Sequence, residues 1–136
     1  MTPVPPIIRH PSVDPQQPSP EQSRWDSRYE KGCTPGHDKV SAWLQAQAHL
    51  LTGGRALDVA CGKGRHSLWL LQHGYEVDAV DISVAGLNVL AHRAHELGFD
   101  TRIRLIHADL KHWRPSVDTY DLVLMTRYLN RALWPP

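Results

Sequence analysis

Three aspartates at the ends of expected strands could together recognise a nucleoside. Asp58 lies in the apolar run 56–60, Asp81 ends the run that starts at residue 75, and Asp109 follows the run 102–107. A carboxylate has two oxygens and can accept hydrogen bonds from both neighbouring hydroxyls of a ribose. The carboxyl ends of successive parallel strands meet in one crevice, where such sheets bind ligands. The acids therefore predict a nucleoside site and leave open which nucleoside. Asp81 has a second explanation that needs no ligand: a negative charge is favourable just before the N-terminus of a helix.

The stretch 55–67 joins the first of these strands to a helix through a turn with two glycines. Gly62 and Gly64 allow a positive φ and let a ligand approach the backbone. The helix that follows presents unpaired N–H groups and a partial positive charge. The dinucleotide-binding fingerprint needs a third glycine where this chain has Ser67. This departure, with an acid inside the strand, argues against an NAD(P)-dependent oxidoreductase, which remains an alternative.

The run from Asp58 to Gly64, DVACGKG, resembles the first motif of the Rossmann-like, S-adenosylmethionine-dependent methyltransferases. In that family an acid is followed by two small residues and then by glycine-x-glycine. The resemblance implies that S-adenosyl-L-methionine is the cofactor. This ligand has no phosphate, so the turn need not cradle one. Methyl transfer needs alignment and exclusion of water more than acid–base groups, so the missing catalytic triad is no objection.

The resemblance also implies which residues hold each part of the cofactor. Backbone N–H groups of the turn would hold the carboxylate, and Asp58 would hold the amino group directly or through water. Asp81 would accept the ribose hydroxyls. Asp109 would accept the adenine amino group, while the backbone N–H of Leu110 meets a ring nitrogen. The cofactor-binding residues expected on this basis are Tyr29, Asp58, Ala60, Cys61, Gly62, Gly64, Asp81, Ile82, Asp109 and Leu110.

The runs VACGKGRHS and VDIS together resemble a bacterial, small-molecule branch of this family, akin to the tellurite-resistance and thiopurine methyltransferases, and two further segments resemble small-molecule methyltransferases. Trp25, Asp26 and Tyr29 lie in SRWDSRY, similar to a segment that folds over the cofactor as a lid. The alternative is a short helix that packs Trp25 and Tyr29 onto the domain. DLVLMTRYLNR resembles the fourth-strand motif, and it implies substrate contacts by Arg127 and Tyr128. Alternatively, Arg127 is a charge on the surface and Tyr128 anchors a helix.

Strands alternate with helices along the rest of the chain, which predicts an α/β fold with a doubly wound, Rossmann-like parallel sheet. Strands are expected at 56–60, 75–80, 102–107 and 120–125, and helices at 38–51, 65–73 and from Ser83 to 97. Trp43 is expected in the core. Seven of the 11 prolines fall in residues 1–22, so this segment is expected to be a disordered tail before a methyltransferase domain at 23–136.

Composition limits the remaining possibilities. A length of 136 residues suits one domain, and a net charge of +1 gives no field that favours nucleic acid or an anionic membrane. No apolar run is long enough to span a bilayer, and no signal peptide is recognisable. Cys33 and His37 lack a second ligand pair, so no metal site is expected. Both cysteines are expected to be reduced, in a cytoplasmic protein.

The family's sheet has seven strands, and this sequence provides four. If the order follows the family, 3-2-1-4, the last strand is an apolar edge that invites pairing with another chain. We expect a C-terminally truncated methyltransferase that transfers a methyl group to a small-molecule acceptor, with self-association through the open edge. A non-catalytic binding or regulatory remnant is the alternative. The sequence does not identify the acceptor.

Overall fold

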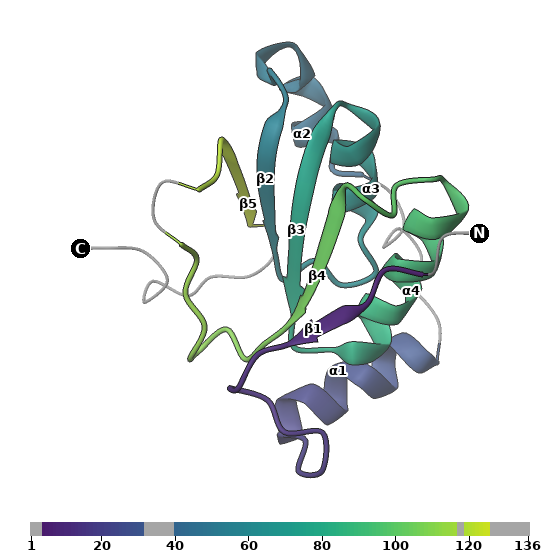
Figure 1. The fold of residues 1–136 in the computed structure, drawn as a ribbon, viewed down its shortest axis with the longest axis vertical. Helices are drawn as coiled ribbons and strands as arrows, with labels where there is room; N and C mark the ends of the chain where they lie inside the picture. The colour runs from purple at the N-terminus through teal and green to yellow at the C-terminus, as the bar shows by residue number, and fades with distance from the viewer. Residues whose placement is uncertain (1–3, 32–39, 117–118, 126–136) are drawn as a thin grey trace.

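The computed structural model describes residues 4–31, 40–116 and 119–125, and one parallel β-sheet lies at its centre (Figure 1). Its strands lie in the order β1-β4-β3-β2-β5. They span Ile7–Arg9 (β1), Ile103–His107 (β4), Tyr75–Asp81 (β3), Gly54–Val59 (β2) and Leu122–Met125 (β5). Neighbouring strands run parallel throughout this order. The predicted Rossmann-like sheet is confirmed, and the four expected strands have the expected 3-2-1-4 order.

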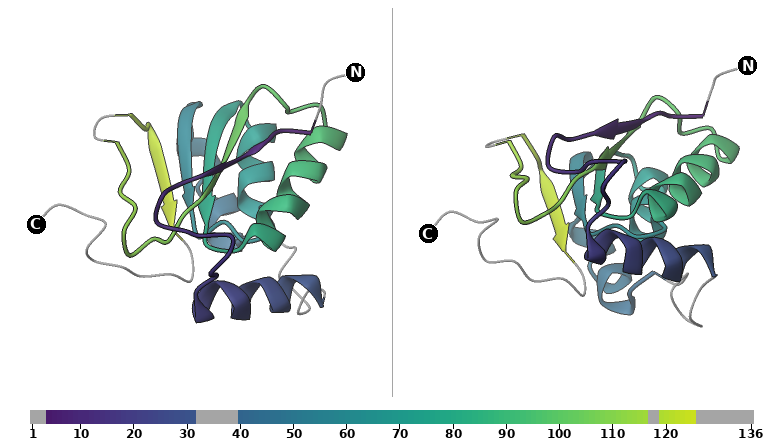
Figure 2. Two further views of the ribbon diagram at one scale, coloured as in Figure 1. Left: turned by 60° about the horizontal axis from the view of Figure 1, so that its bottom comes forward. Right: turned by 90° about the horizontal axis from the view of Figure 1, so that it is seen from below.

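The central strands β2 and β3 are buried over most of their length, as is typical of strands inside a parallel sheet, and they bury Asp58 and Asp78 as well as apolar residues. Helices α3 (Arg65–Gln72) and α4 (Val84–Glu96) cover one face, and each connects two parallel strands (Figure 2). Leu70, Leu87 and Leu90 are fully buried there. The opposite face packs against the segment after β4, in a cluster that includes Leu57, Val80 and Trp113.

The N-terminal segment differs from the predicted disordered tail. Ile7–Arg9 pairs with β4 in parallel register, with Arg9 opposite His107. Ser19 caps the start of helix α1 (Pro20–Glu30), because its hydroxyl accepts the backbone N–H of Gln22 at 3.1 Å. The expected boundary between residues 22 and 23 therefore falls inside a helix. Prolines before and after an edge strand are tolerated, because the outer side of such a strand needs no ladder hydrogen bonds.

Two other expectations need correction. The helix expected at 38–51 is a short α2 (Ala42–Ala46) followed by a 3₁₀ turn at Ala48–Leu50, and its first two residues lie outside the described part. Trp43 is 66% exposed, not in the core. The five-residue α2 directs Leu44 inward instead, with 2% exposure.

Strand β5 forms the edge of the described sheet beyond β2, as the 3-2-1-4 order predicts. Its Val123 is 36% exposed. Over the described residues, no helix is both long and apolar enough to cross a bilayer.

Candidate cofactor-binding site

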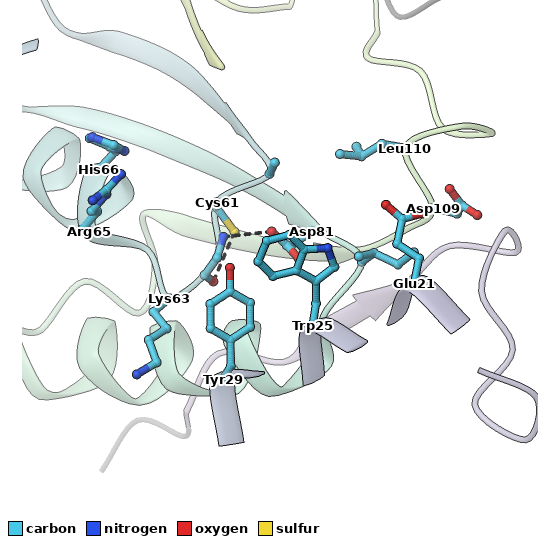
Figure 3. Close-up of a pocket in the computed structure, with 13 residues that line it drawn as sticks. Glu21, Trp25, Tyr29, Cys61, Lys63, Arg65, His66, Asp81, Asp109 and Leu110 are labelled. Carbon is cyan, nitrogen blue, oxygen red and sulfur yellow. Dashed lines mark hydrogen bonds between the residues drawn. The ribbon is translucent and has the colours of Figure 1, made fainter. Parts of the chain in front are cut away.

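A pocket opens at the carboxyl ends of β2, β3 and β4 (Figure 3), and α1 lies across these strand ends (Figure 1). Four segments build its wall: α1, the β2–α3 turn, the end of β3 and the loop after β4. The lining residues are Glu21, Trp25, Tyr29, Ala60, Cys61, Gly62, Lys63, Arg65, His66, Asp81, Ile82, Asp109 and Leu110. Eight of the ten cofactor-binding residues expected from the sequence are among them. The other two, Asp58 and Gly64, lie behind the wall.

The β2–α3 turn has the conformation that its glycines suggest. Ala60, Gly62 and Gly64 have φ values of +58°, +59° and +86°. A Cβ on Gly62 would lie 2.7 Å from the Tyr29 hydroxyl oxygen, and a Cβ on Gly64 would overlap the side chain of Leu90. The first glycine therefore allows α1 to approach the turn, while the second allows α4 to pack beneath it.

Cys61 is a buried free thiol in this turn. Burial raises its pKa well above the usual value, and the carboxylates of Asp81 and Asp58 add to the shift. The thiol therefore stays protonated at neutral pH. Cys61 contributes its backbone and a small apolar side chain to the pocket wall.

Asp81 ends β3 and connects two parts of the pocket. One carboxylate oxygen accepts the backbone N–H of Gly62 at 2.8 Å, and the other accepts that of Ser83 at 2.8 Å. Burial raises the pKa of Asp81 to about 6, although these hydrogen bonds oppose the shift. A carboxylate offers about four lone-pair directions, so two bonds leave it able to accept from a ligand hydroxyl.

Asp58 is 1% exposed and lies beneath the turn rather than on the pocket wall. One of its oxygens accepts the Ser67 hydroxyl at 2.7 Å. The other, Oδ1, is buried without a hydrogen-bond partner in the described part of the chain. Burial raises the pKa of Asp58 to about 7, the Ser67 hydroxyl opposes this, and the Asp81 charge adds to it. Ser67, at the missing third-glycine position, thus serves as a partner for this acid.

Asp109 and Leu110 follow β4 and line the opposite side of the pocket. The Asp109 backbone N–H donates to Ser12 Oγ at 2.9 Å, and its carboxylate accepts the Lys111 N–H at 3.0 Å. Ile82, 7% exposed, closes the wall between Asp81 and this loop. The structure therefore brings two of the three expected acids, Asp81 and Asp109, into one pocket, while Asp58 lies behind its wall.

Helix α1 occupies the place expected of a lid. Trp25 and Tyr29 stack with ring centroids 5.8 Å apart, and both point into the pocket (Figure 3). The Arg28 guanidinium lies 5.2 Å from the Trp25 ring centroid. These aromatic side chains cover the turn and Asp81 on the side away from the sheet.

Sequence reasoning missed four lining residues: Glu21, Lys63, Arg65 and His66. The Ser19-Pro20 start signal would have extended α1 upstream and placed Glu21 on the face of Trp25 and Tyr29, at steps of four. The other three lie in or just after the glycine turn, where only folding decides which side chains face the ligand. The expected substrate residues Arg127 and Tyr128 lie outside the described residues.

Charge is distributed unevenly around this pocket. Lys63, Arg65 and His66 lie at the α3 end, whereas Glu21 and Asp109 lie at the opposite end, with Asp81 between them (Figure 3). In the described ranges, no group of three or more histidine, cysteine, aspartate or glutamate side chains is arranged to hold a metal ion. The pocket therefore suits an elongated organic ligand with an anionic group at one end and hydroxyl or amino donors at the other.

The fold and the pocket are those expected of a Rossmann-like methyltransferase, and sequence comparison identifies the same family. A methyltransferase domain family model matches residues 56–136, and the chain belongs to that family. It is 37% identical over 71 residues to the ribosomal protein uL3 glutamine methyltransferase of Neisseria meningitidis serogroup A, covering 51% of this chain and 23% of that protein. It is 33% identical over 93 residues to the ubiquinone biosynthesis O-methyltransferase of Burkholderia orbicola, covering 68% and 39%. The chain thus spans only 23% to 39% of the length of these relatives.

Solved structures agree on the fold. An S-adenosylmethionine-dependent methyltransferase from Geobacter sulfurreducens, in complex with S-adenosyl-L-homocysteine, is 25% identical with a TM-score of 0.59, over 75% of this chain and 42% of that one. A second, from Mesorhizobium loti, is 30% identical with a TM-score of 0.51, over 62% of this chain and 39% of that one.

Proposed function

We propose that this chain binds S-adenosyl-L-methionine and takes part in methyl transfer to a small-molecule acceptor. The observation that carries the proposal is the meeting of Asp81, Asp109 and the glycine turn in one pocket beneath Tyr29. Family membership and the cofactor-product complex of a structural relative support it. The cofactor supplies an electrophilic methyl group on a sulfonium.

The residues present fit each end of this ligand. The turn between Cys61 and Gly64 suits the carboxylate through the cationic side chains of Lys63 and Arg65, which line the pocket beside it. Three of its backbone N–H groups already donate within the protein, those of Cys61, Gly62 and Gly64. Oδ1 of Asp58, which has no hydrogen-bond partner among the described residues, lies behind the wall and would reach the ammonium group through water. Asp81 would accept the ribose hydroxyls.

Adenine would lie against Ile82 and Leu110, with Asp109 receiving its amino group. The α1 aromatics Trp25 and Tyr29 would exclude water from the reacting centre, which matters more than acid–base catalysis in an in-line displacement. We assign no catalytic residue.

A small-molecule acceptor is proposed because VACGKGRHS, VDIS and the fourth-strand motif resemble a branch of the family that acts on small molecules. The relatives act, by their names, on a ribosomal protein and in ubiquinone biosynthesis, so a protein acceptor is the competing possibility. Arg127 and Tyr128 remain the proposed substrate contacts.

The cofactor assignment predicts a large effect of Asp81→Ala. We expect S-adenosyl-L-homocysteine to bind the purified chain one-to-one, and the substitution to weaken binding by about 1–3 kcal/mol, the scale of hydrogen bonds to a charged group. Isothermal titration calorimetry measures both. Glu76→Ala is the matched control, since Glu76 lies on the same strand with a side chain 57% exposed at the far end.

Three results would contradict the proposal. A folded wild-type chain that gives no heat with S-adenosyl-L-homocysteine would exclude the cofactor. Tight binding of NADH instead would favour the oxidoreductase. Equal affinities of the Asp81→Ala and Glu76→Ala variants would remove Asp81 from the ribose site.

A further inference from the structure

The N-terminal arm, residues 4–31, precedes the family match at residues 56–136, yet it contacts both loops that carry the expected nucleoside-binding acids. It consists of β1, a connecting segment and α1 (Figure 2). Two of its side chains, Ser12 and Asp26, hydrogen-bond to these loops. Neither residue lines the pocket itself.

Ser12 holds the loop of Asp109. Its hydroxyl oxygen accepts the Asp109 backbone N–H at 2.9 Å. Ser12 is itself fixed by His10, because His10 Nδ1 accepts the Ser12 N–H at 3.1 Å and lies 2.8 Å from its hydroxyl oxygen. His10 continues the pairing of β1, since its N–H donates to the carbonyl of His107 at 2.9 Å. The arm thus pairs with β4 and then hydrogen-bonds, through Ser12, to the loop that follows β4.

Asp26 holds the loop of Asp81. One of its oxygens accepts the Ser83 hydroxyl at 2.6 Å and the Ala85 backbone N–H at 3.0 Å. Ser83 in turn donates its backbone N–H to Asp81 at 2.8 Å and caps α4 by accepting the Gly86 N–H. Asp26 therefore places a second acceptor at the start of α4 and restrains the residue that orients Asp81.

We propose that Ser12 and Asp26 are positioning residues that together hold the adenosine-binding side of the pocket in its binding geometry. The inference rests on the proposed function for the identity of the ligand. The arm keeps two loops, from two different strands, at a fixed separation before the ligand arrives. Preorganisation of this kind raises affinity by lowering the cost of ordering the loops on binding.

The test measures binding of S-adenosyl-L-homocysteine and of 5′-methylthioadenosine, which keeps the adenosine and lacks the amino-acid end. Ser12→Ala is expected to weaken binding of both ligands about 3- to 10-fold, and Asp26→Ala about 10-fold or more, the range of single neutral and charged hydrogen bonds. Equal losses for both ligands locate the effect on the adenosine side. Ser23→Ala, an exposed serine of α1, is the matched control and should bind as wild type does.

Conservative variants separate positioning from folding. Ser12→Thr keeps the hydroxyl and Asp26→Asn keeps an acceptor oxygen, so both should bind within about threefold of wild type. Backbone hydrogen exchange gives a readout that needs no ligand: the Asp109 amide should exchange faster in Ser12→Ala, and the Ala85 amide faster in Asp26→Ala.

Unchanged affinities and unchanged exchange in both alanine variants would overturn the inference. So would conservative variants that fold as wild type does and bind as weakly as the alanine variants. Failure of the proposed function looks different, because wild type itself would then bind neither ligand while the exchange changes would persist.

Discussion

Gly64→Ala is expected to lower the free energy of unfolding by about 2–5 kcal/mol, the largest single-residue effect on folding that we predict. Two costs add at this position. The residue has φ +86°, which L side chains rarely adopt, and the new methyl group would overlap the side chain of Leu90. Leu90 is fully buried in α4, where the close packing of a protein core limits how far its side chain can shift. Urea-induced unfolding, followed by circular dichroism, measures the effect.

Gly74→Ala and Gly98→Ala are matched controls for this experiment. Both glycines have positive φ, +91° and +79°, and a Cβ on either would meet no heavy atom within 4 Å. Each substitution should therefore cost only the backbone strain, about 1 kcal/mol. If Gly64→Ala is no more destabilising than these two, close packing of α4 beneath the turn is not what this glycine provides.

Asp58→Asn is expected to remove a pH dependence of stability. Because burial raises the pKa of Asp58 from 3.8 to about 7, the folded chain binds this proton more tightly than the unfolded chain. The resulting stability is fully present below about pH 4 and is lost as pH rises to about 7, on the order of 4 kcal/mol in total. Relative to wild type, Asp58→Asn should therefore lose less stability between these pH values. Urea unfolding at pH 4, 5.5 and 7.5 measures this difference.

Asp78→Asn is the matched comparison, with the opposite sign. Asp78 is also 1% exposed, on the neighbouring strand. Burial works to raise its pKa, but hydrogen bonds from Arg104 and Tyr120 outweigh this and the pKa is lowered. Its stabilisation is therefore present above about pH 4 and lost as pH falls, and Asp78→Asn should lower stability at neutral pH by about 1–3 kcal/mol. Parallel pH profiles for wild type and Asp58→Asn would contradict the assignment of Asp58.

The contrast between these two buried acids bears on the site. The structure satisfies Asp78 with a guanidinium and a phenol, and it leaves one oxygen of Asp58 without a partner among the described residues. A carboxyl group left in this state costs stability, and proteins tolerate such costs at functional sites. This supports the proposal that a cationic ligand group completes the environment of Asp58 through water.

The local patterns of the sequence determined the core of the fold and of the site. Apolar runs separated by amphipathic segments predicted β2, β3, β4 and β5, and the resemblance to the family implied the order in which they lie. The two glycines predicted a turn of positive φ, and the three acids predicted a crevice at the strand ends. These features are local: a turn conformation depends on its own residues, and parallel strands bring their carboxyl ends together whatever else surrounds them.

Only the tertiary structure decided the features that depend on distant partners. The short strand at Ile7–Arg9 forms because β4 has an unpaired edge, and the proline-rich sequence around it does not predict that pairing. Trp43 is exposed because its helix is too short to bury more than one side. The contacts of Ser12 and Asp26 join residues up to 97 positions apart. Local propensity is weak for such short elements, so long-range packing settles whether they form and what they touch.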